Sequence, residues 1–296
     1  MHVMSPLTLL PRLPRLLRLP SPDGLCASSA LLRATALDLA ILAGHVLFYP
    51  TGLTPERRRD VPGADQELGT DVLPRGVTAL PTAPEDDRPP VVLLHGFIDN
   101  RSVFVLLRRS LARHGRRHLE SLNYSPLTCD IRSAAELLGR HVEEICARTG
   151  HPRVDIVGHS LGGLIARYYV QRLGGDHRVR VLVTLGTPHN GTSVASLASA
   201  HPIVRQMRTG SALIDELRTP APGCRTHFVS FWSELDRVMV PVRTACIDHP
   251  DLDAENVRVT GIGHLALPVH PAVAARIRQE LDRSGGLPLA GGATVA

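Results

Sequence analysis

The chain has 296 residues and is 43% hydrophobic, which is enough apolar material for one sizeable core. Charged residues make up 21%, aromatic residues 3%, and the formal net charge is +5, with arginine as the only basic residue type besides histidine. This composition excludes fibrous and disordered chains, and the arginines form no stripe interleaved with aromatic residues, so we expect no nucleic-acid binding.

The first ninety residues are predicted to form an N-terminal extension. Pro11, Pro14 and Pro20 interrupt any helix near the start. The apolar run at 34–49 predicts a helix over 31–48, but the run contains Asp38 and His45 and is too short to span a bilayer. We expect this helix to pack on the catalytic domain, with peripheral contact to a membrane surface as the alternative. No clear signal peptide is present, so we favour a cytoplasmic or membrane-associated protein over a secreted one.

A Pro- and Gly-rich connector at 50–90 leads into the predicted catalytic domain, residues 91–284, and residues 285–296 are expected to be a flexible tail. Short apolar runs predict strands at 91–94, 118–122, 154–157, 179–185, 226–232 and 257–260. Helical spacing predicts helices at 102–114, 131–148, 161–173 and 271–283, with Asp130 as an N-cap. This alternation predicts an α/β fold with a mainly parallel sheet of about six strands flanked by helices.

The five cysteines are scattered and form no CxxC pair, which argues against a disulfide framework or a zinc site. Cys224 and Cys246 bracket one predicted strand and could pair in an oxidising compartment. We favour the simpler interpretation that they are small buried apolar residues.

The most specific motif is Gly158-His159-Ser160-Leu161-Gly162, which fits G-x-S-x-G. A predicted strand runs into it and a predicted helix leaves it, as the motif requires. Glycines two positions before and after the serine remove side chains that would collide where strand and helix pack together. The motif therefore predicts a sharp turn that exposes the Ser160 hydroxyl at a helix N-terminus, where negative charge is favoured.

The block from residue 91 to 191 resembles bacterial lipases and esterases of the α/β-hydrolase superfamily, and it is most similar to small lipases whose sheet lacks the first strands of the full fold. The resemblance is carried by VVLLHGF at 91–97, GHSLGG at 158–163 and GTPHNG at 186–191. It implies an oxyanion hole made by the backbone N–H groups of Phe97 and Leu161. We interpret His95 as a histidine that orients this loop.

The chain order of this superfamily, serine then acid then histidine, guides the choice of the other catalytic residues. Asp236 precedes an apolar pair and a proline, as the family's acid does, and Glu234 is the alternative. His264 follows Gly261 and Gly263 in the loop after the last predicted strand, and His249 and His270 are the alternatives. The resemblance thus implies a Ser160–His264–Asp236 triad that needs no metal and no organic cofactor.

Residues 191–220 separate a core strand from the acid loop and carry many apolar side chains, so they are either a lid that binds an acyl chain or an ordinary packed excursion. We expect a lipid or small-ester substrate and a lipase or carboxylesterase activity. A thioesterase or acyltransferase on the same triad is the alternative. A non-catalytic binding protein would be expected to carry a damaged triad. The sequence identifies no protein partner.

Overall fold

The computed structural model describes residues 22–48, 88–97, 101–124, 130–197, 201–283 and 294–295. Most of the predicted N-terminal extension and of the predicted C-terminal tail therefore lies outside the described residues. Thr294 and Val295, within that tail, form the two-residue strand β7 beside β6.

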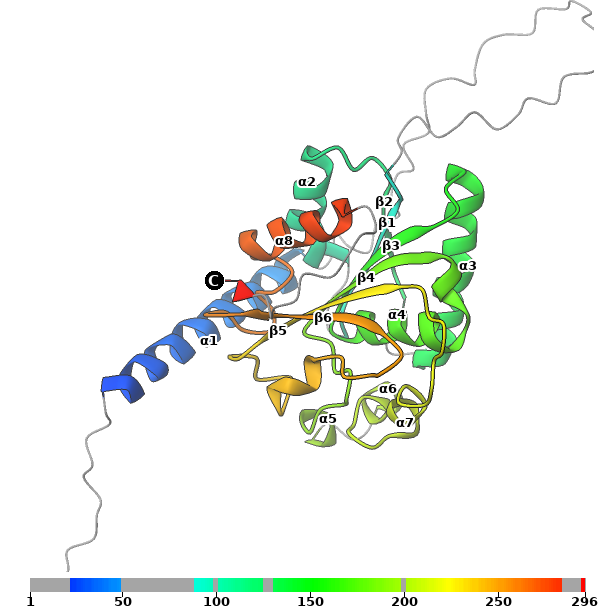
Figure 1. Cartoon of the computed structure of the whole chain (residues 1–296). Coiled ribbons are helices and arrows are strands. Elements are labelled where there is room, and N and C mark those ends of the chain that lie inside the picture. The colour runs from blue at the N-terminus through cyan, green and yellow to red at the C-terminus, as the bar shows by residue number, and fades with distance from the viewer. Residues whose placement is uncertain are drawn as a thin grey trace, which may run out of the picture.

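A single parallel sheet with the strand order β2-β1-β3-β4-β5-β6-β7 organises the chain (Figure 1). Every strand pair in it is parallel. The other strands are β1 (Val91–Leu94), β2 (Leu119–Leu122), β3 (Val154–His159), β4 (Val179–Leu185), β5 (His227–Ser233) and β6 (Asp253–Val259). The predicted sheet is confirmed. Its largest boundary shift is at β6, which begins four residues before the apolar stretch at 257–260; the prediction left these residues out because three of the four are polar.

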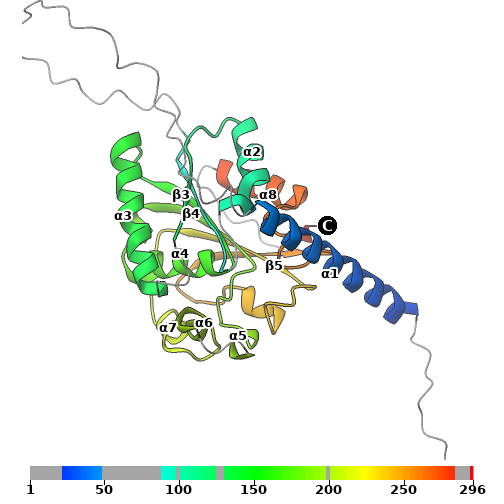
Figure 2. The ribbon, with the colours of Figure 1, turned by 180° about the vertical axis from the view of Figure 1, so that it is seen from behind.

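Helices cover both faces of the sheet, as βαβ units require (Figures 1 and 2). On one face α3 (Ile131–Thr149) and α4 (Leu161–Arg172) pack against side chains such as Val92 and Leu94. On the other face, α2 (Val105–Arg113) and α8 (Pro271–Asp282) pack against Val91 and Leu93, which alternate with Val92 and Leu94 along β1. The alternation along β1 therefore divides the core into two layers, each buried under its own helices.

The helix boundaries follow local signals that the sequence contained. Asp130 caps α3 by accepting a hydrogen bond from the Ser133 N–H at 2.9 Å, and Gly150 ends it in a left-handed conformation. Where one helix was predicted at 102–114, a 3₁₀ turn at Arg101–Phe104 leads into α2.

The predicted N-terminal helix is present as α1 (Pro22–Phe48) and starts earlier than the apolar run. It lies along the same side of the domain as α2 and α8, and its first turns extend beyond the body of the molecule (Figures 1 and 2). Ala34 is buried against the domain, whereas Leu32 and Leu39 on another face are 71% and 61% exposed. Within the described residues, no helix has the length and apolar character that crossing a membrane needs.

The segment at 191–220 folds into three short helices, α5 (Val194–Leu197), α6 (Pro202–Gln206) and α7 (Ala212–Glu216). They lie together at the end of the molecule below α4 in Figure 1. Their buried side chains join the core layer of α3 and α4, and include Ile203, Val204, Leu213, Ile214 and Leu217.

Candidate active site

The predicted site residues follow the carboxyl ends of neighbouring strands. Phe97 comes after β1, Ser160 after β3, Asp236 after β5 and His264 after β6, and these strands lie on one stretch of the sheet. The chain leaves β1 toward β2 on one side, whereas β3 lies on the other side, so strand order reverses between β1 and β3. In open parallel sheets, ligands bind outside the carboxyl ends at such a switch point.

Ser160 lies at a strained bend between β3 and α4. Its backbone angles are φ 51° and ψ −118°, and it is the one non-glycine residue with positive φ in the described part of the chain. The bend is held in place because the Ser160 N–H donates to the carbonyl of Leu185 at 2.8 Å. The Ser160 carbonyl in turn accepts from the Thr187 hydroxyl at 3.0 Å. Strain of this kind persists only where the surroundings fix it, and it marks functional sites.

The glycines of the motif are required by close backbone contacts. A Cβ on Gly158 would lie 2.5 Å from the Gly163 backbone, and a Cβ on Gly162 would lie 2.3 Å from the carbonyl oxygen of Leu94. Both distances are far below van der Waals contact. Neither glycine has a positive φ, so space rather than conformation demands glycine at these positions.

Asp236 and His264 form a buried pair, with Oδ2 of Asp236 2.7 Å from Nδ1 of His264. Oδ1 of Asp236 accepts from the N–H groups of Val238 and Met239 at 2.8 and 2.9 Å. Burial alone would raise the pKa of the Asp236 carboxyl, but His264 and these two amides outweigh it and lower the pKa. Asp236 is therefore an ionised acceptor that orients the imidazole.

The His264 ring lies beside the residues that flank Ser160. Its ring centroid is 4.9 Å from that of His159, the residue before the serine. A Cβ on Gly186 would lie 2.9 Å from Nδ1 of His264, and Gly186 follows the Leu185 carbonyl that holds the Ser160 N–H. The chain thus brings residues 160, 236 and 264 into one corner of the sheet edge.

The alternative acid and bases are engaged elsewhere. Glu234 pairs with Arg258 and is one-third exposed. His249 contacts the carbonyl of Thr219 at 3.1 Å, and His270 directly precedes α8.

The loop after β1 is held by an aromatic stack. The rings of His95 and Tyr124 are parallel with centroids 4.5 Å apart, and the Tyr124 hydroxyl donates to the His95 carbonyl. Phe97 follows and meets the ring of His201, at the start of α6, edge to face at 5.5 Å. Leu161 is the first residue of α4, where backbone N–H groups have no partner within the helix.

Sequence reasoning missed two groups near this edge. His189 is completely buried and its Nε2 lies 2.9 Å from the Thr184 hydroxyl, while the guanidinium of Arg167 donates to the His189 carbonyl at 3.1 Å. Complete burial lowers the pKa of Arg167 to about 9 and, together with Arg167, lowers the pKa of His189 well below 6.5. The second group is Asp38 of α1, which contacts the loop that carries His264. No local sequence pattern predicts the burial of His189 or the contact that Asp38 makes.

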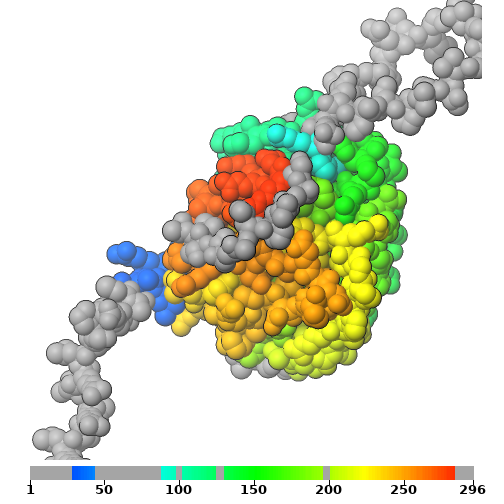
Figure 3. Space-filling model, in the orientation of Figure 1, coloured from blue at the N-terminus to red at the C-terminus, as the bar shows by residue number. Residues whose placement is uncertain are grey.

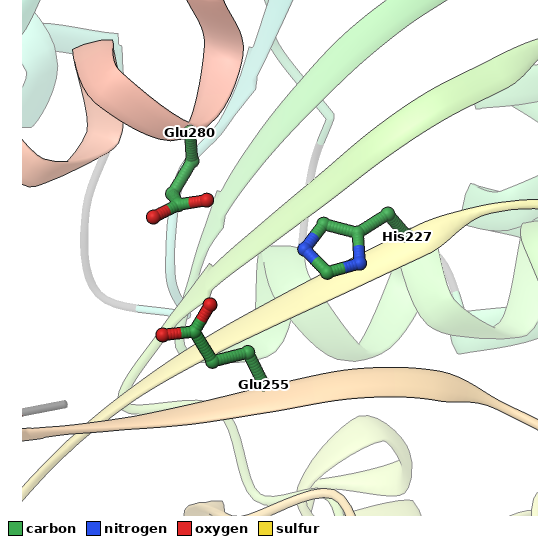
Figure 4. A group of neighbouring side chains, drawn as sticks. All are labelled: His227, Glu255 and Glu280. Carbon is green, nitrogen blue, oxygen red and sulfur yellow. The ribbon is translucent and has the colours of Figure 1, made fainter. Parts of the chain in front are cut away.

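One group of side chains in the described residues has the donor types of a metal site: His227, Glu255 and Glu280 (Figure 4). Arg276 lies 2.7 Å from Glu255 and 2.6 Å from Glu280, and Arg283 lies 2.8 Å from Glu280. The carboxylates are therefore already neutralised by two guanidinium groups. His227 begins β5, so this ion-pair network lies toward the end of the sheet opposite to Ser160.

Cys146, Cys224 and Cys246 are free thiols in the structure. The pairing of Cys224 with Cys246 that an oxidising compartment would allow is not formed.

Comparisons with known proteins agree with this architecture. The α/β-hydrolase fold family matches residues 89–215. Triacylglycerol lipases of Pseudarthrobacter phenanthrenivorans and Burkholderia plantarii are each 30% identical over 115 residues, which is 36% of this chain and 35% and 32% of the two lipases. The match therefore spans about a third of the length of these curated relatives.

Solved structures show the same fold. A Bacillus licheniformis lipase in its mature form gives a TM-score of 0.56 at 16% identity, over 67% of this chain and 94% of the lipase. A Listeria innocua gene product gives a TM-score of 0.54 at 16% identity, over 70% of this chain and 98% of the other. Figure 3 shows the surface of this protein in the same orientation as Figure 1.

Proposed function

We propose that the chain is an α/β-hydrolase that acts as a serine hydrolase of carboxylic esters, a lipase or carboxylesterase, because the α/β-hydrolase fold family matches residues 89–215 and the curated relatives are triacylglycerol lipases. Ser160 is the nucleophile, His264 the general base and Asp236 the acid that orients it. The observation that carries the proposal is the buried Asp236–His264 pair at the same sheet edge as the strained bend of Ser160.

The chemistry proceeds in two acyl-transfer steps. Nε2 of His264 accepts the Ser160 proton as Oγ attacks the ester carbonyl, and the resulting oxyanion is stabilised by the backbone N–H groups of Phe97 and Leu161. The tetrahedral adduct collapses, and the imidazolium gives its proton to the departing alkoxide, which leaves as an alcohol. Water, deprotonated by His264, then attacks the acyl-enzyme and releases the carboxylic acid while the proton returns to Ser160.

An apolar acyl chain is the substrate feature that the surroundings favour. The helices α5 to α7 supply aliphatic side chains to the core, and Phe97 of the oxyanion loop contacts His201 at the start of α6. The segment is also tied to the acid loop, because the Thr192 hydroxyl donates to the Val238 carbonyl at 2.6 Å. We therefore propose that residues 191–220 form the wall of the site that binds the acyl chain. The substrates would then be triacylglycerols or other fatty-acid esters.

A series of p-nitrophenyl esters from acetate to palmitate tests the proposal, with Ser160→Ala as the matched control. We expect hydrolysis by the wild type that rises with acyl length beyond acetate, and none by the variant. Acyl-CoA thioesters assayed in parallel, and an alcohol acceptor added to the ester assay, separate an esterase from a thioesterase or an acyltransferase on the same triad. Absence of turnover on every ester would contradict the proposal.

A further inference from the structure

The face of α1 that meets the catalytic domain contains one carboxylate. The side chains on that face recur at helical spacing and are Leu31, Ala34, Thr35, Asp38, Ile41 and Leu42. Ala34 is 1% exposed, and Ile41 packs against the core layer under α2 and α8. Burying a carboxylate on such a packed face costs free energy unless the carboxylate is hydrogen-bonded. The hydrogen-bond partners of Asp38 therefore indicate what it does.

Those partners are the backbone amides that directly follow His264. Oδ1 of Asp38 accepts from the N–H of Leu265 at 3.1 Å and from the N–H of Ala266 at 3.2 Å. Both bonds join α1 to a loop more than 200 residues later in the chain, and they fix the backbone next to the imidazole.

Gly263, on the other side of His264, is in contact with the same carboxylate. The three heavy atoms nearest to a Cβ at residue 263 all belong to Asp38, and the closest, Oδ2, would be 2.1 Å away. Gly263 has no positive φ, so the close approach of Asp38 is what requires glycine there. The carboxylate of Asp38 thus contacts the loop both before and after the imidazole.

The same carboxylate also acts on the charge of the site. In the described part of the chain, the groups shown to interact with the His264 side chain are Asp236 by a hydrogen bond, Asp38 by charge and the ring of His159 by a tilted ring contact. Half-burial raises the pKa of Asp38, against the opposing effects of His264 and of the loop amides. When ionised, Asp38 is a second negative charge that favours the imidazolium formed during acyl transfer.

We propose that Asp38 is a positioning residue for His264, through which the N-terminal helix α1 becomes part of the catalytic apparatus. Its carboxylate holds residues 263–266 so that the imidazole stays between Asp236 and Ser160. The inference rests on the proposed role of His264 as the general base.

The test is kcat and KM on a p-nitrophenyl ester across pH, with the full-length chain and its Asp38→Ala and Asp38→Asn variants. Asp38→Ala should lower kcat about tenfold or more with little change in KM, because a loosened base is misplaced for proton transfer. Asp38→Asn keeps an oxygen that accepts both amides, so it should restore most of kcat. The Asp38→Asn variant lacks the negative charge that favours the imidazolium. The acidic limb of its kcat–pH profile should therefore move to lower pH than in the wild type, by more than the replicate error.

Thr35→Ala is the matched control, since Thr35 lies one turn earlier on the same face and bonds only within the helix, to the Leu31 carbonyl. It should leave kcat within about twofold of the wild type, in keeping with a side chain that does not touch the loop. Circular dichroism shows whether each variant folds.

Gly263→Ala supplies a geometric check. It should lower kcat in the wild-type background, where the new methyl meets the Asp38 carboxylate, and cause no further loss in the Asp38→Ala background. Equal losses from Gly263→Ala in both backgrounds, or an unchanged kcat for Asp38→Ala, would overturn the inference while leaving the hydrolase intact. A wild type without ester turnover would overturn the proposed function and the inference with it.

Discussion

Oδ2 of Asp236 lies 2.7 Å from Nδ1 of His264, and both side chains are buried. The second oxygen of Asp236 is held by two backbone N–H groups, which leaves the carboxylate one orientation. With an ionised acceptor at Nδ1, that nitrogen carries the proton, and Nε2 keeps the lone pair that the proposed general base requires. This tautomer is what a serine nucleophile needs.

Asp236→Asn should therefore lower kcat by about ten-thousandfold with little loss of stability, because an amide can present N–H to Nδ1 and reverse the tautomer. Glu234→Gln is the matched control, since Glu234 is the neighbouring carboxylate and pairs with Arg258 instead. Steady-state hydrolysis of a short-chain ester measures both. If Glu234→Gln were the crippling change, the acid has been assigned to the wrong residue.

Gly162→Ala should destabilise the fold by about 3 kcal/mol or more and abolish turnover, because its Cβ would meet the carbonyl oxygen of Leu94. Gly150→Ala is the control, because Gly150 has a φ of 74° with open space around it and a Cβ there causes backbone strain without a clash. This change should lower the free energy of unfolding by about 1 kcal/mol. Denaturant melts and ester assays compare the two. A Gly162→Ala protein as stable and active as Gly150→Ala would refute the close strand-to-helix contact.

His189 makes stability depend on pH. The unfolded chain binds a proton at residue 189 near pH 6.5, whereas burial lowers the pKa of the folded His189 well below that. The stabilising contribution is complete above pH 6.5 and is lost as pH falls toward the lower folded pKa, with a slope of up to about 1.4 kcal/mol per pH unit. His189→Gln removes this titration, so urea melts between neutral and mildly acidic pH should give a shallower slope than the wild type. Parallel profiles would contradict the prediction, because they would show that His189 binds its proton at the same pH in the folded and unfolded chains.

The exposed leucines of α1 predict attachment to a lipid surface, in line with the fatty-ester substrates that we propose. Leu32 and Leu39 lie on one face of α1. Val105 and Leu106, at the start of α2 and directly after the 3₁₀ turn that contacts α1, are about half exposed. The double variant Leu32→Glu, Leu39→Glu should lose co-flotation with phosphatidylcholine–phosphatidylglycerol vesicles. Leu173→Glu, at an exposed leucine after α4, should still float. Wild-type protein that stays out of the vesicle fraction would contradict the prediction.

The sheet and the bend of Ser160 could be predicted because their signals are local. Apolar runs of strand length alternate with helical spacing, and Gly158 reports a close contact with Gly163, five residues later in the chain. The start of β6 could not, since Asp253, Glu255 and Asn256 are polar and none of them is buried. Asp38 could not either: its partners are 227 residues and more away in sequence, and a lone acidic residue in an apolar run gives no hint of what it bonds to.

Covalent labelling tests the central claim most directly. The account predicts that a fluorophosphonate probe attaches to the native protein at a single residue, that peptide mass spectrometry locates the adduct on Ser160, and that Ser160→Ala and heat-denatured protein remain unlabelled. A native, folded protein that takes up no probe, or that carries it on a different serine, would contradict the assignment of Ser160 as an activated nucleophile.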